Sequence, residues 1–383
     1  MHVTQAFYLL IHIYIVGIMN LKKNHKKLDK KRRIIRRLAY IVGTIALFLV
    51  LVYAGARTLV YVGQKGLYSK ANSSGPKLDI DNSDENSDGN GYVWQDGWVR
   101  YNGDIYEYNE DILTFLVMGI DKKGVATESW NLTGGGQSDA LFLLIVNPHN
   151  KQMSIFAIDR NTMTDVTMVG VGDGGVDIVS KAQIAVQHGF GDGGAGSCEL
   201  TRDAVSKLLF DLPIHGYISV NYEAIPYIND AVGGVEVTIP EDAAGAKWEW
   251  NAGDTVTLKG QDAIRFVKWR DTSIYESARL RTKRQKMYLT SFVDKAMEAT
   301  KKDITMPITL YNKVKRYTVT DISIDEMSYL ASELISYKFS GDQIYTMNGE
   351  TVTGDVYEEF YPDMEALKEQ MIGIFYEKVD VNQ

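Results

Sequence analysis

The chain has 383 residues, 45% of them hydrophobic and 23% charged, which is enough for one large globular domain or two medium ones. Its single cysteine, Cys198, excludes an internal disulfide and a cysteine-based metal cluster, and is expected to be a small buried side chain. From Leu38 onward the chain holds 31 of its 41 Lys and Arg residues and 48 of its 49 Asp and Glu residues, a formal charge of -17. A general nucleic-acid binder is therefore excluded, because binding a phosphate backbone needs excess positive charge.

The first 37 residues carry ten basic residues against one acid. Within them, residues 3–21 are mostly apolar and have two interpretations. They form a second membrane span, or they are upstream sequence misread as coding, with Met19 as the true start. Under either interpretation, the basic N-terminal segment within residues 1–37 is predicted to lie on the cytoplasmic side of a membrane.

An uncharged apolar run follows directly over residues 38–56. As a helix it spans roughly 28 Å, close to the hydrocarbon thickness of a bilayer. No small-residue cleavage site follows it, so the sequence predicts a retained anchor over residues 38–62. Because the excess of Lys and Arg precedes this run, the rest of the chain is predicted to lie outside the cell membrane.

Polar and acidic residues dominate residues 63–90, which predicts a flexible linker between the anchor and a folded domain. Residues 91–110 are rich in aromatic side chains and predict a short β element that packs across the main domain, with carbohydrate stacking as an alternative role. These aromatic residues include Trp94, Trp98, Tyr101, Tyr106 and Tyr108.

Further along, short apolar runs bounded by turn residues predict buried strands, whereas apolar residues at helical spacing predict helices. The predicted strands are residues 112–118, 140–146, 152–158 and 235–239. The predicted helices are residues 184–188, 199–209, 222–231, 261–267, 281–297, 324–334 and 364–375. Strands mixed with helices predict an α/β (α+β) domain in which a mixed central β-sheet is covered by helices on both faces.

The turn-forming residues 147–151 (NPHNK) join two of these strands and predict a hairpin. If the turn is centred between His149 and Asn150, the numbers of paired residues sum to about 299, which sets Asp139 opposite Arg160. If the strand over 112–118 runs parallel to the strand over 152–158, Asp121 reaches the same edge of the sheet. Proteins of the α/β class bind ligands at such an edge.

Two carboxylates and one guanidinium at a sheet edge suit phosphate chemistry. Asp121 and Asp139 can hold Mg²⁺, which prefers oxygen ligands and shares its coordination shell with substrate phosphate. Arg160 can bind phosphate oxygens in a bidentate manner. The simpler alternatives are turn or cap roles for the two aspartates and a surface ion pair for Arg160.

A second cluster of basic residues lies within residues 268–285. Lys268 and Arg270 are two positions apart, so they point the same way if the chain there is extended. One stripe of a predicted helix consists of Arg281, Arg284, Gln285 and Tyr288. In so acidic a chain this concentration of positive charge favours a pyrophosphate site, with a solvated basic face as the alternative.

Six stretches, in matching order and spacing, resemble the LytR-CpsA-Psr family of cell-envelope phosphotransferases. They are residues 115–121 (FLVMGID), 137–148 (QSDALFLLIVNP), 154–163 (SIFAIDRNTM), 229–240 (NDAVGGVEVTIP), 258–271 (LKGQDAIRFVKWRD) and 281–285 (RTKRQ). On this resemblance, residues 111–300 are expected to form the catalytic domain and residues 301–383 a C-terminal extension that packs on it.

The resemblance implies a mixed-sheet fold with a deep apolar channel for a polyprenyl tail and a pyrophosphate at the mouth. It implies Mg²⁺-assisted transfer of a glycopolymer, of teichoic acid or capsular polysaccharide type, from a polyprenyl-pyrophosphate carrier to peptidoglycan as a phosphodiester. By position, Asp121 and Asp139 would bind Mg²⁺, and Arg160, Asp139 and Arg270 would be catalytic. The residues expected to bind the pyrophosphate are Arg160, Lys268, Arg270, Arg281 and Gln285.

Two positions depart from the family pattern. Asn161 stands where the family usually has Asp, which removes a carboxylate that could act as a base or orient Arg160. Lys268 stands where the family usually has Arg, which keeps the charge but loses bidentate geometry. These departures favour one alternative, a non-catalytic polyprenyl-phosphate binding or scaffolding protein of the cell envelope. A transcriptional regulator is disfavoured, because residues 1–37 have no DNA-binding fold.

Overall fold

The computed structural model describes residues 30–70, 75–78, 94–95, 97–126, 134–170, 175–243, 249–271, 273, 277–339, 343–354 and 357–380. The possible extra segment over residues 3–21 and most of the region between residues 71 and 93 lie outside the described residues. The chain forms two compact units, Met1–Thr58 and Leu59–Gln383, which are described separately.

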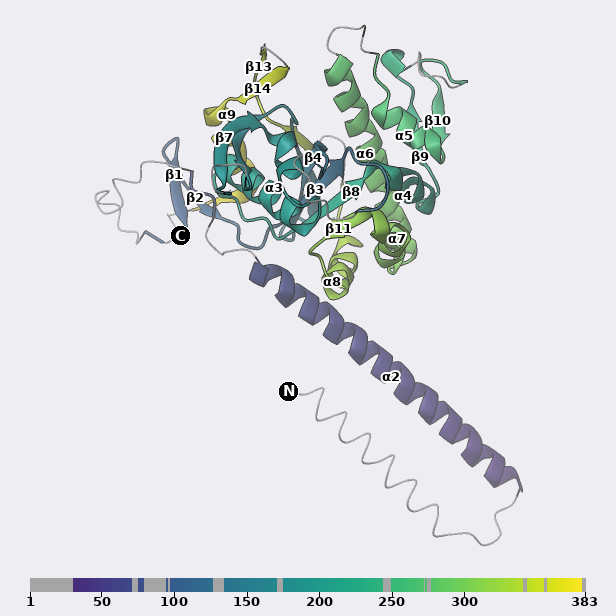
Figure 1. Cartoon of the computed structure of the whole chain (residues 1–383). Coiled ribbons are helices and arrows are strands. Elements are labelled where there is room, and N and C mark those ends of the chain that lie inside the picture. Colours follow the sequence, from purple (N-terminus) through teal and green to yellow (C-terminus); the bar gives the residue numbers. More distant parts are fainter. Residues whose placement is uncertain are drawn as a thin grey trace. The chain divides into compact units, whose positions relative to one another are not determined.

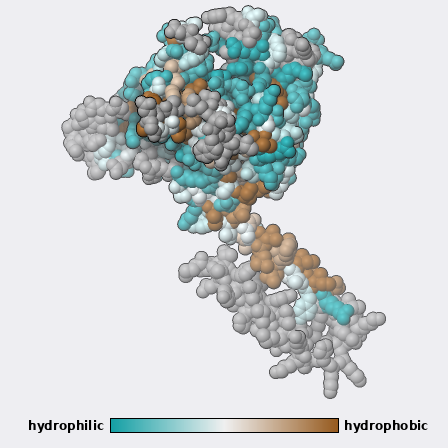
Figure 2. All heavy atoms as spheres, viewed as in Figure 1, coloured by the Kyte–Doolittle hydropathy of each residue, from teal (hydrophilic) through white to brown (hydrophobic). Residues whose placement is uncertain are grey.

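Helix α2 (Lys30–Lys70) contains the predicted anchor. Its stretch Arg37–Lys70 is the one helix of the described residues that is long and apolar enough to cross a membrane, and an 18-residue segment within it has a mean hydropathy of 2.3. Large apolar side chains such as Ile41, Phe48 and Leu49 are exposed along it, and Figure 2 shows the hydrophobic surface gathered on this helix. Such exposure fits contact with lipid.

The last turns of α2 belong to the folded unit. Leu67 is fully buried, and Lys70 forms an ion pair with Glu326 at 2.8 Å. A Cβ atom at Gly63 would lie 2.1 Å from the carbonyl oxygen of Asp325, so glycine permits the close approach of α2 to α8 (Ile324–Leu334). Part of the predicted linker therefore packs on the domain, as does Leu78 further along.

A six-stranded mixed sheet with the order β11-β8-β3-β4-β5-β12 forms the centre of the domain. Figure 1 labels β11, β8, β3 and β4 of this sheet. Its strands are β3 (Leu113–Ile120), β4 (Ser138–Asn147), β5 (Gln152–Ile158), β8 (Gly216–Asn221), β11 (Thr318–Thr320) and β12 (Ile344–Thr346). β4 pairs antiparallel with β3 and β5, whereas β8 is parallel to β3 and β12 is parallel to β5.

Smaller sheets of two or three strands and the remaining helices surround this sheet (Figure 1). The strands are β1 (Trp98–Tyr101), β2 (Asp104–Tyr108), β6 (Met163–Met168), β7 (Ile178–Gln183), β9 (Val235–Thr238), β10 (Thr255–Leu258), β13 (Gly349–Thr353), β14 (Glu358–Pro362) and β15 (Tyr376–Lys378). The helices are η1 (Ile184–Phe190), α3 (Ala195–Leu208), η2 (Tyr222–Ala224), α4 (Ile225–Ala231), η3 (Glu241–Ala243), α5 (Gln261–Lys268), α6 (Ser277–Lys302), α7 (Met306–Val314), η4 (Lys315–Tyr317) and α9 (Met364–Phe375).

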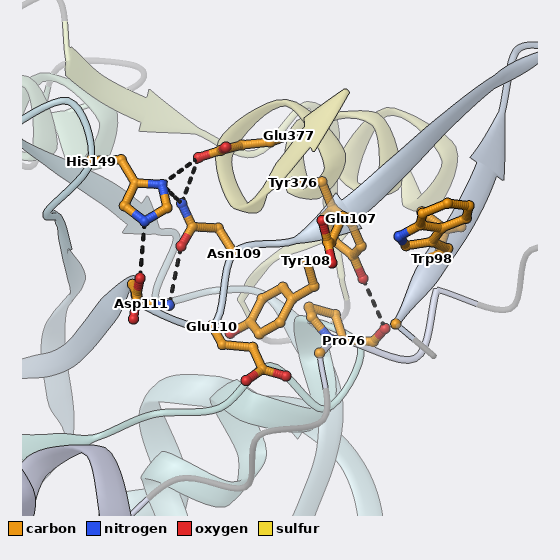
Figure 3. A pocket seen from close by; sticks show the side chains of 13 residues that line it. Pro76, Trp98, Glu107, Tyr108, Asn109, Glu110, Asp111, His149, Tyr376 and Glu377 are labelled. Atoms are coloured by element: carbon orange, nitrogen blue, oxygen red, sulfur yellow. Dashed lines mark hydrogen bonds and ion pairs between the residues drawn. The ribbon is translucent and has the colours of Figure 1, made fainter. Parts of the chain in front are cut away.

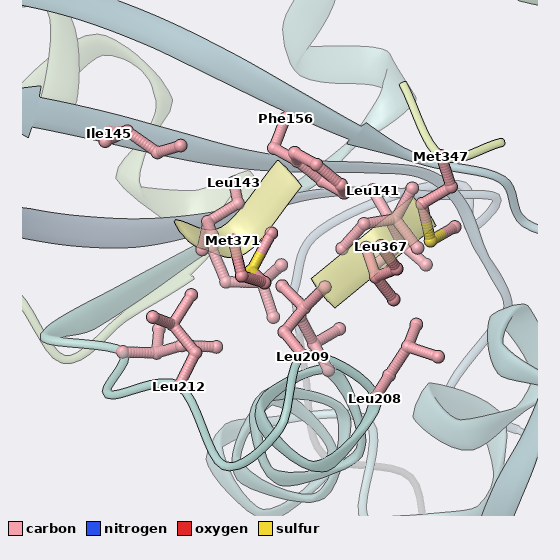
Figure 4. Packing of buried hydrophobic residues seen from close by; sticks show 14 of the residues in the cluster. Leu141, Leu143, Ile145, Phe156, Leu208, Leu209, Leu212, Met347, Leu367 and Met371 are labelled. Atoms are coloured by element: carbon pink, nitrogen blue, oxygen red, sulfur yellow. The ribbon is translucent and has the colours of Figure 1, made fainter. Parts of the chain in front are cut away.

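Helices cover both faces of the sheet, as predicted. On one face, the sheet side chains pack against α3 and α9 in a closed core, which Figure 4 shows. The labelled members of this core include Leu141, Leu143, Ile145, Phe156, Leu208, Leu209, Leu367 and Met371. On the other face, Phe115 packs in a cluster with residues of α6, α7, α8 and the end of α2. Beyond it, Val117 and Phe142 are only partly buried, because that part of the face opens into a cavity.

The far end of the β4–β5 hairpin, by contrast, carries a polar network beside the sheet β1-β2-β15 (Figure 3). His149 in the hairpin turn bonds Asp111 through Nε2 and Glu377 through Nδ1, each at 2.9 Å. Asn109 joins the same Glu377 oxygen at 2.7 Å. A cavity of about 790 Å³ lies beside this network. The network connects the start of the domain, the hairpin turn and the C-terminal strand.

Candidate functional site

The open end of the β4–β5 hairpin brings Asp139 and Arg160 together. The observed register pairs Leu141 with Ile158 and Asn147 with Gln152, which confirms the pairing expected from the sequence. Arg160 Nη1 contacts Asp139 Oδ1, and Arg160 Nη2 donates a 2.8 Å hydrogen bond to Gln137 Oε1. The pairing of β3 with β4 shifts near Asp139. Irregularities of this kind often aim a side chain beside an active site.

Gln137 also holds the end of β3 in place. Its carbonyl oxygen accepts hydrogen bonds from the backbone nitrogens of Asp121, at 2.9 Å, and Asp139, at 3.1 Å. The preceding Gly136 has a φ of 79°, and a Cβ atom there would lie 2.9 Å from a methyl group of Ile120. Only glycine therefore lets this loop lie so close to β3 without strain.

Asp121 is paired with Lys268. Lys268 Nζ lies 2.8 Å from Asp121 Oδ1 and 3.5 Å from the centre of the Tyr222 ring. Lys268 is the last residue of α5, and the chain becomes extended only after it, at Trp269 with φ −58° and ψ 139°. The helix continues this far because Ala263, Phe266 and Val267 bury its apolar face.

Helix α6 supplies the next group of side chains. The residues of its predicted stripe have two different roles. Gln285 donates a 3.3 Å hydrogen bond to the carbonyl of Val267, and Arg281 lines the cavity described below. Arg284 turns away and is buried against Asp242, Phe266 and Trp269. Arg284 therefore fixes α6 onto α5 and does not face the site.

A cavity of about 220 Å³ lies among β3, β4, β8, α4 and α6. Along β3 its lining passes from Val117 to Asp121, and along β4 it passes from Phe142 to Asp139. The interior is apolar and includes Val117, Phe142, Val220, Ile225, Ile228, Leu289 and Phe292. The polar lining residues are Asp121, Asp139, Lys268, Arg281 and Gln285, and Tyr222 and Tyr288 also contribute to the lining. Arg160 lines a neighbouring cavity of about 90 Å³ that shares Asp139 and Gln285.

Charge is concentrated where these cavities meet. Burial lowers the pKa of Arg281; Asp139 raises it and the nearby Arg160 and Arg270 lower it. The Nε atoms of Arg160 and Arg281 are both buried and have no hydrogen-bond partner among the described residues. A buried donor without a partner is costly, so these two atoms are suited to an anionic ligand.

The two aspartates provide a limited donor set for a metal. Asp121 and Asp139 line the same cavity, and each engages a cationic side chain through Oδ1. No group of three or more His, Cys, Asp or Glu side chains suited to a metal occurs among the described residues. Two carboxylates nevertheless fit Mg²⁺, which commonly takes one or two protein carboxylates and completes its shell with water and substrate phosphate.

All seven predicted site residues are near this region: six line the two cavities, and Arg270 is close enough to affect the pKa of Arg281. The side chain of Asn161 is directed elsewhere, since its Oδ1 accepts a 3.0 Å hydrogen bond from Gln183. Gln137 and Tyr222 were not predicted as site residues from the sequence. Gln137 stands two positions before Asp139, and this spacing in an extended chain was the available signal.

Comparison with known proteins gives this site a family context. The family model described as "LytR_cpsA_psr family" matches residues 67–372. A teichoic acid transferase named polyisoprenyl-teichoic acid–peptidoglycan teichoic acid transferase TagU, from Oceanobacillus iheyensis, is 27% identical over 87% of this chain and 91% of its own length.

Solved structures share the fold. The crystal structure of B. subtilis TagV aligns with a TM-score of 0.52 and 22% identity, over 68% of this chain and 96% of that one. A structure described as TagT bound to LI-WTA aligns with a TM-score of 0.52 and 19% identity, over 69% of this chain and 91% of that one. The matched model covers most of the chain, including the whole cavity lining, and the chain belongs to the LytR_cpsA_psr family.

Proposed function

We propose that this protein transfers a teichoic acid type glycopolymer from a polyprenyl-pyrophosphate carrier to peptidoglycan, forming a phosphodiester. The buried Nε atoms of Arg160 and Arg281, which have no hydrogen-bond partner among the described residues, carry this proposal together with the neighbouring apolar cavity. An anionic head group would satisfy Arg160 and Arg281, while an isoprenoid tail would occupy the apolar interior. The names of relatives such as TagU support the same donor and acceptor.

In the proposed reaction, a sugar hydroxyl of peptidoglycan attacks the phosphorus that bears the glycopolymer. The new P–O bond forms as the bond to the bridging oxygen of the pyrophosphate breaks, and polyprenyl phosphate leaves. The hydroxyl proton is released to water. Arg160, Arg281 and Lys268 stabilise the charge that collects on the phosphate oxygens. Asp121 and Asp139 would hold Mg²⁺, which when bound neutralises further phosphate charge.

The membrane segment of α2 is proposed to retain the protein at the outer side of the membrane. The basic block before Leu38 supports this orientation. The donor is a membrane lipid, so an anchored enzyme meets it at a raised effective concentration.

The proposed function is tested with the full chain in detergent, a polyprenyl-pyrophosphate-linked donor and peptidoglycan oligomers. Arg160→Ala and Arg281→Ala are each expected to lower kcat/KM about 30- to 1,000-fold, because each removes a charge-assisted contact in a partly dry site. Asp139→Asn should raise the Mg²⁺ concentration that gives half-maximal transfer.

Arg202→Ala is the matched control, since Arg202 lies on α3 and pairs with its neighbour Asp203 at 3.2 Å. It should transfer at the wild-type rate. Wild-type protein that binds the donor tightly but transfers nothing would instead support a non-catalytic binding or scaffolding role.

A further inference from the structure

A hollow adjoins the apolar cavity that Asp121 and Lys268 line, and it is larger than that cavity. It has a volume of about 690 Å³, within the range of about 300–1,000 Å³ that is typical of ligand pockets. Tyr222 lines both this hollow and the apolar cavity, and its ring also lies under the Lys268 ammonium group. The two spaces therefore meet at one side chain.

An aromatic platform forms one wall of this hollow. Tyr227 of α4 is half exposed and stacks on the buried Tyr317, with ring centres 5.6 Å apart and planes inclined by 15°. The guanidinium of Arg316 lies 4.7 Å from the Tyr317 ring centre. The Tyr317 ring therefore supports one face of the Tyr227 ring. A rigid tyrosine face is a suitable surface for the C–H face of a sugar ring.

Polar side chains complete the lining. Gln261 and Lys313 are exposed and can hydrogen-bond sugar hydroxyls, as can Asp230. Glu223 accepts a 3.0 Å hydrogen bond from the backbone nitrogen of Gly124, in the loop that begins at Asp121. The loop that begins at Asp121 therefore contacts the lining of the hollow.

The charge of this lining distinguishes between the two polymers of the reaction. Among the described residues that line the hollow, two are acidic, Glu223 and Asp230, and one is basic, Lys313, so this lining has no excess of positive charge. A teichoic acid repeats negatively charged phosphates and would be disfavoured there. A glycan strand with uncharged sugar rings meets no such penalty.

We propose that this hollow binds the glycan strand of the peptidoglycan acceptor, with Tyr227 as its stacking platform and Gln261 as a hydrogen-bonding partner. This assignment rests on the proposed transferase function. It makes Tyr227 and Gln261 specificity residues for the acceptor and leaves donor binding to the other cavity.

The experiment compares donor and acceptor kinetics in the full chain. Tyr227→Ala and Gln261→Ala should each raise the acceptor KM about tenfold or more while the donor KM stays at the wild-type value. Tyr227→Trp keeps a stacking face and should retain acceptor affinity. Tyr357→Ala is the matched control, since Tyr357 is 47% exposed against 50% for Tyr227.

A binding measurement makes the result independent of turnover. Peptidoglycan glycan oligomers, titrated calorimetrically, should bind the wild-type protein and the Tyr357→Ala control, and should bind Tyr227→Ala at least tenfold more weakly. Thermal unfolding verifies that each variant is folded.

Each result has a distinct consequence. An unchanged acceptor KM and unchanged glycan binding in Tyr227→Ala, with active wild-type protein, overturn the acceptor assignment alone. A rise confined to the donor KM shows that the hollow holds the donor polymer, and this result also overturns the acceptor assignment. If the wild-type protein binds the glycan but does not transfer, and Tyr227→Ala weakens that binding, the glycan site stands and the transferase proposal is contradicted.

Discussion

Lys268 binds two different partners with one ammonium group. It contacts Asp121 at 2.8 Å and the Tyr222 ring at 3.5 Å. A guanidinium could make both contacts, because it forms bidentate pairs with carboxylates and stacks on aromatic rings. Lysine, in place of the arginine that the family resemblance leads us to expect, therefore keeps the local interactions at this position and reduces the number of directed donors.

Lys268→Arg should accordingly transfer glycopolymer at the wild-type rate or up to a few-fold faster. Lys268→Met, which keeps the length but removes the charge, should lose about tenfold or more in kcat/KM. The two variants are compared at saturating Mg²⁺. A large loss in Lys268→Arg would mean that the compact ammonium group itself is required.

At the opposite end of the hairpin, His149 gives the fold a pH dependence. Hydrogen bonds that His149 donates to the Asp111 and Glu377 carboxylates raise the pKa of His149 above its ordinary value of 6.5. A raised folded-state pKa means that the stabilisation is fully present below about pH 6.5 and is lost as the pH rises through the folded pKa. The effect is small, because the side chain is 48% exposed.

His149→Gln should therefore lower the unfolding midpoint more at pH 6 than at pH 8.5. Urea unfolding of the two proteins at both pH values measures this difference. Equal losses at both pH values would show that the protonated state of His149 contributes nothing to stability.

At the scale of single elements, local sequence patterns predicted much of the structure. Strand β5 and helices α8 and α9 begin and end as predicted, because each has a strong pattern and clear boundary residues such as the capping Ser323 and Asp363. The hairpin register also came from local turn chemistry, and with it the contact of Asp139 with Arg160.

What the sequence did not predict depends on contacts between distant segments. Strand β8 was missed, although it lies beside β3 in the centre of the sheet, and Tyr222 follows it directly. The position of Tyr222 beneath Lys268 requires the packing of α5 on α4, which no local pattern encodes. The burial of Arg284 was missed for the same reason, since its partner Asp242 lies on a separate 3₁₀ helix.

Arg284 is expected to determine how firmly α6 presents Arg281 and Gln285. Arg284→Met keeps the apolar stem but leaves Asp242 as a mostly buried carboxylate without its partner, and should destabilise the domain by about 3–5 kcal/mol. Chemical denaturation measures the change. Lys283→Met is the control on the same helix, since Lys283 is exposed, and it should change stability by no more than about 0.5 kcal/mol.

Adding Asp242→Asn to Arg284→Met should recover part of the loss, because the buried charge is removed. A single variant as stable as the wild type would show that the Arg284 ion pair is replaceable by hydration.

At the scale of the whole molecule, an apolar membrane helix and an apolar cavity occur in the same chain. The face of the folded domain that Figure 2 shows is largely hydrophilic. The cavity among β3, β4, β8, α4 and α6 has an apolar lining suited to a lipid tail. The closed core on the other sheet face has side chains interdigitated from α3 and α9 (Figure 4). Close packing on one face and partial coverage on the other therefore give the domain both stability and a binding space.

Full-length protein extracted from membranes should carry polyprenyl phosphate or pyrophosphate, detectable by mass spectrometry after organic extraction. Leu289→Trp places a larger side chain in the cavity lining and should reduce the bound lipid several-fold, because the added volume occupies the space of the tail. Val179→Trp is the control, since Val179 is 61% exposed on β7. If the two variants retain equal amounts of lipid while both remain folded, the tail binds elsewhere and the role of this cavity in donor binding is wrong.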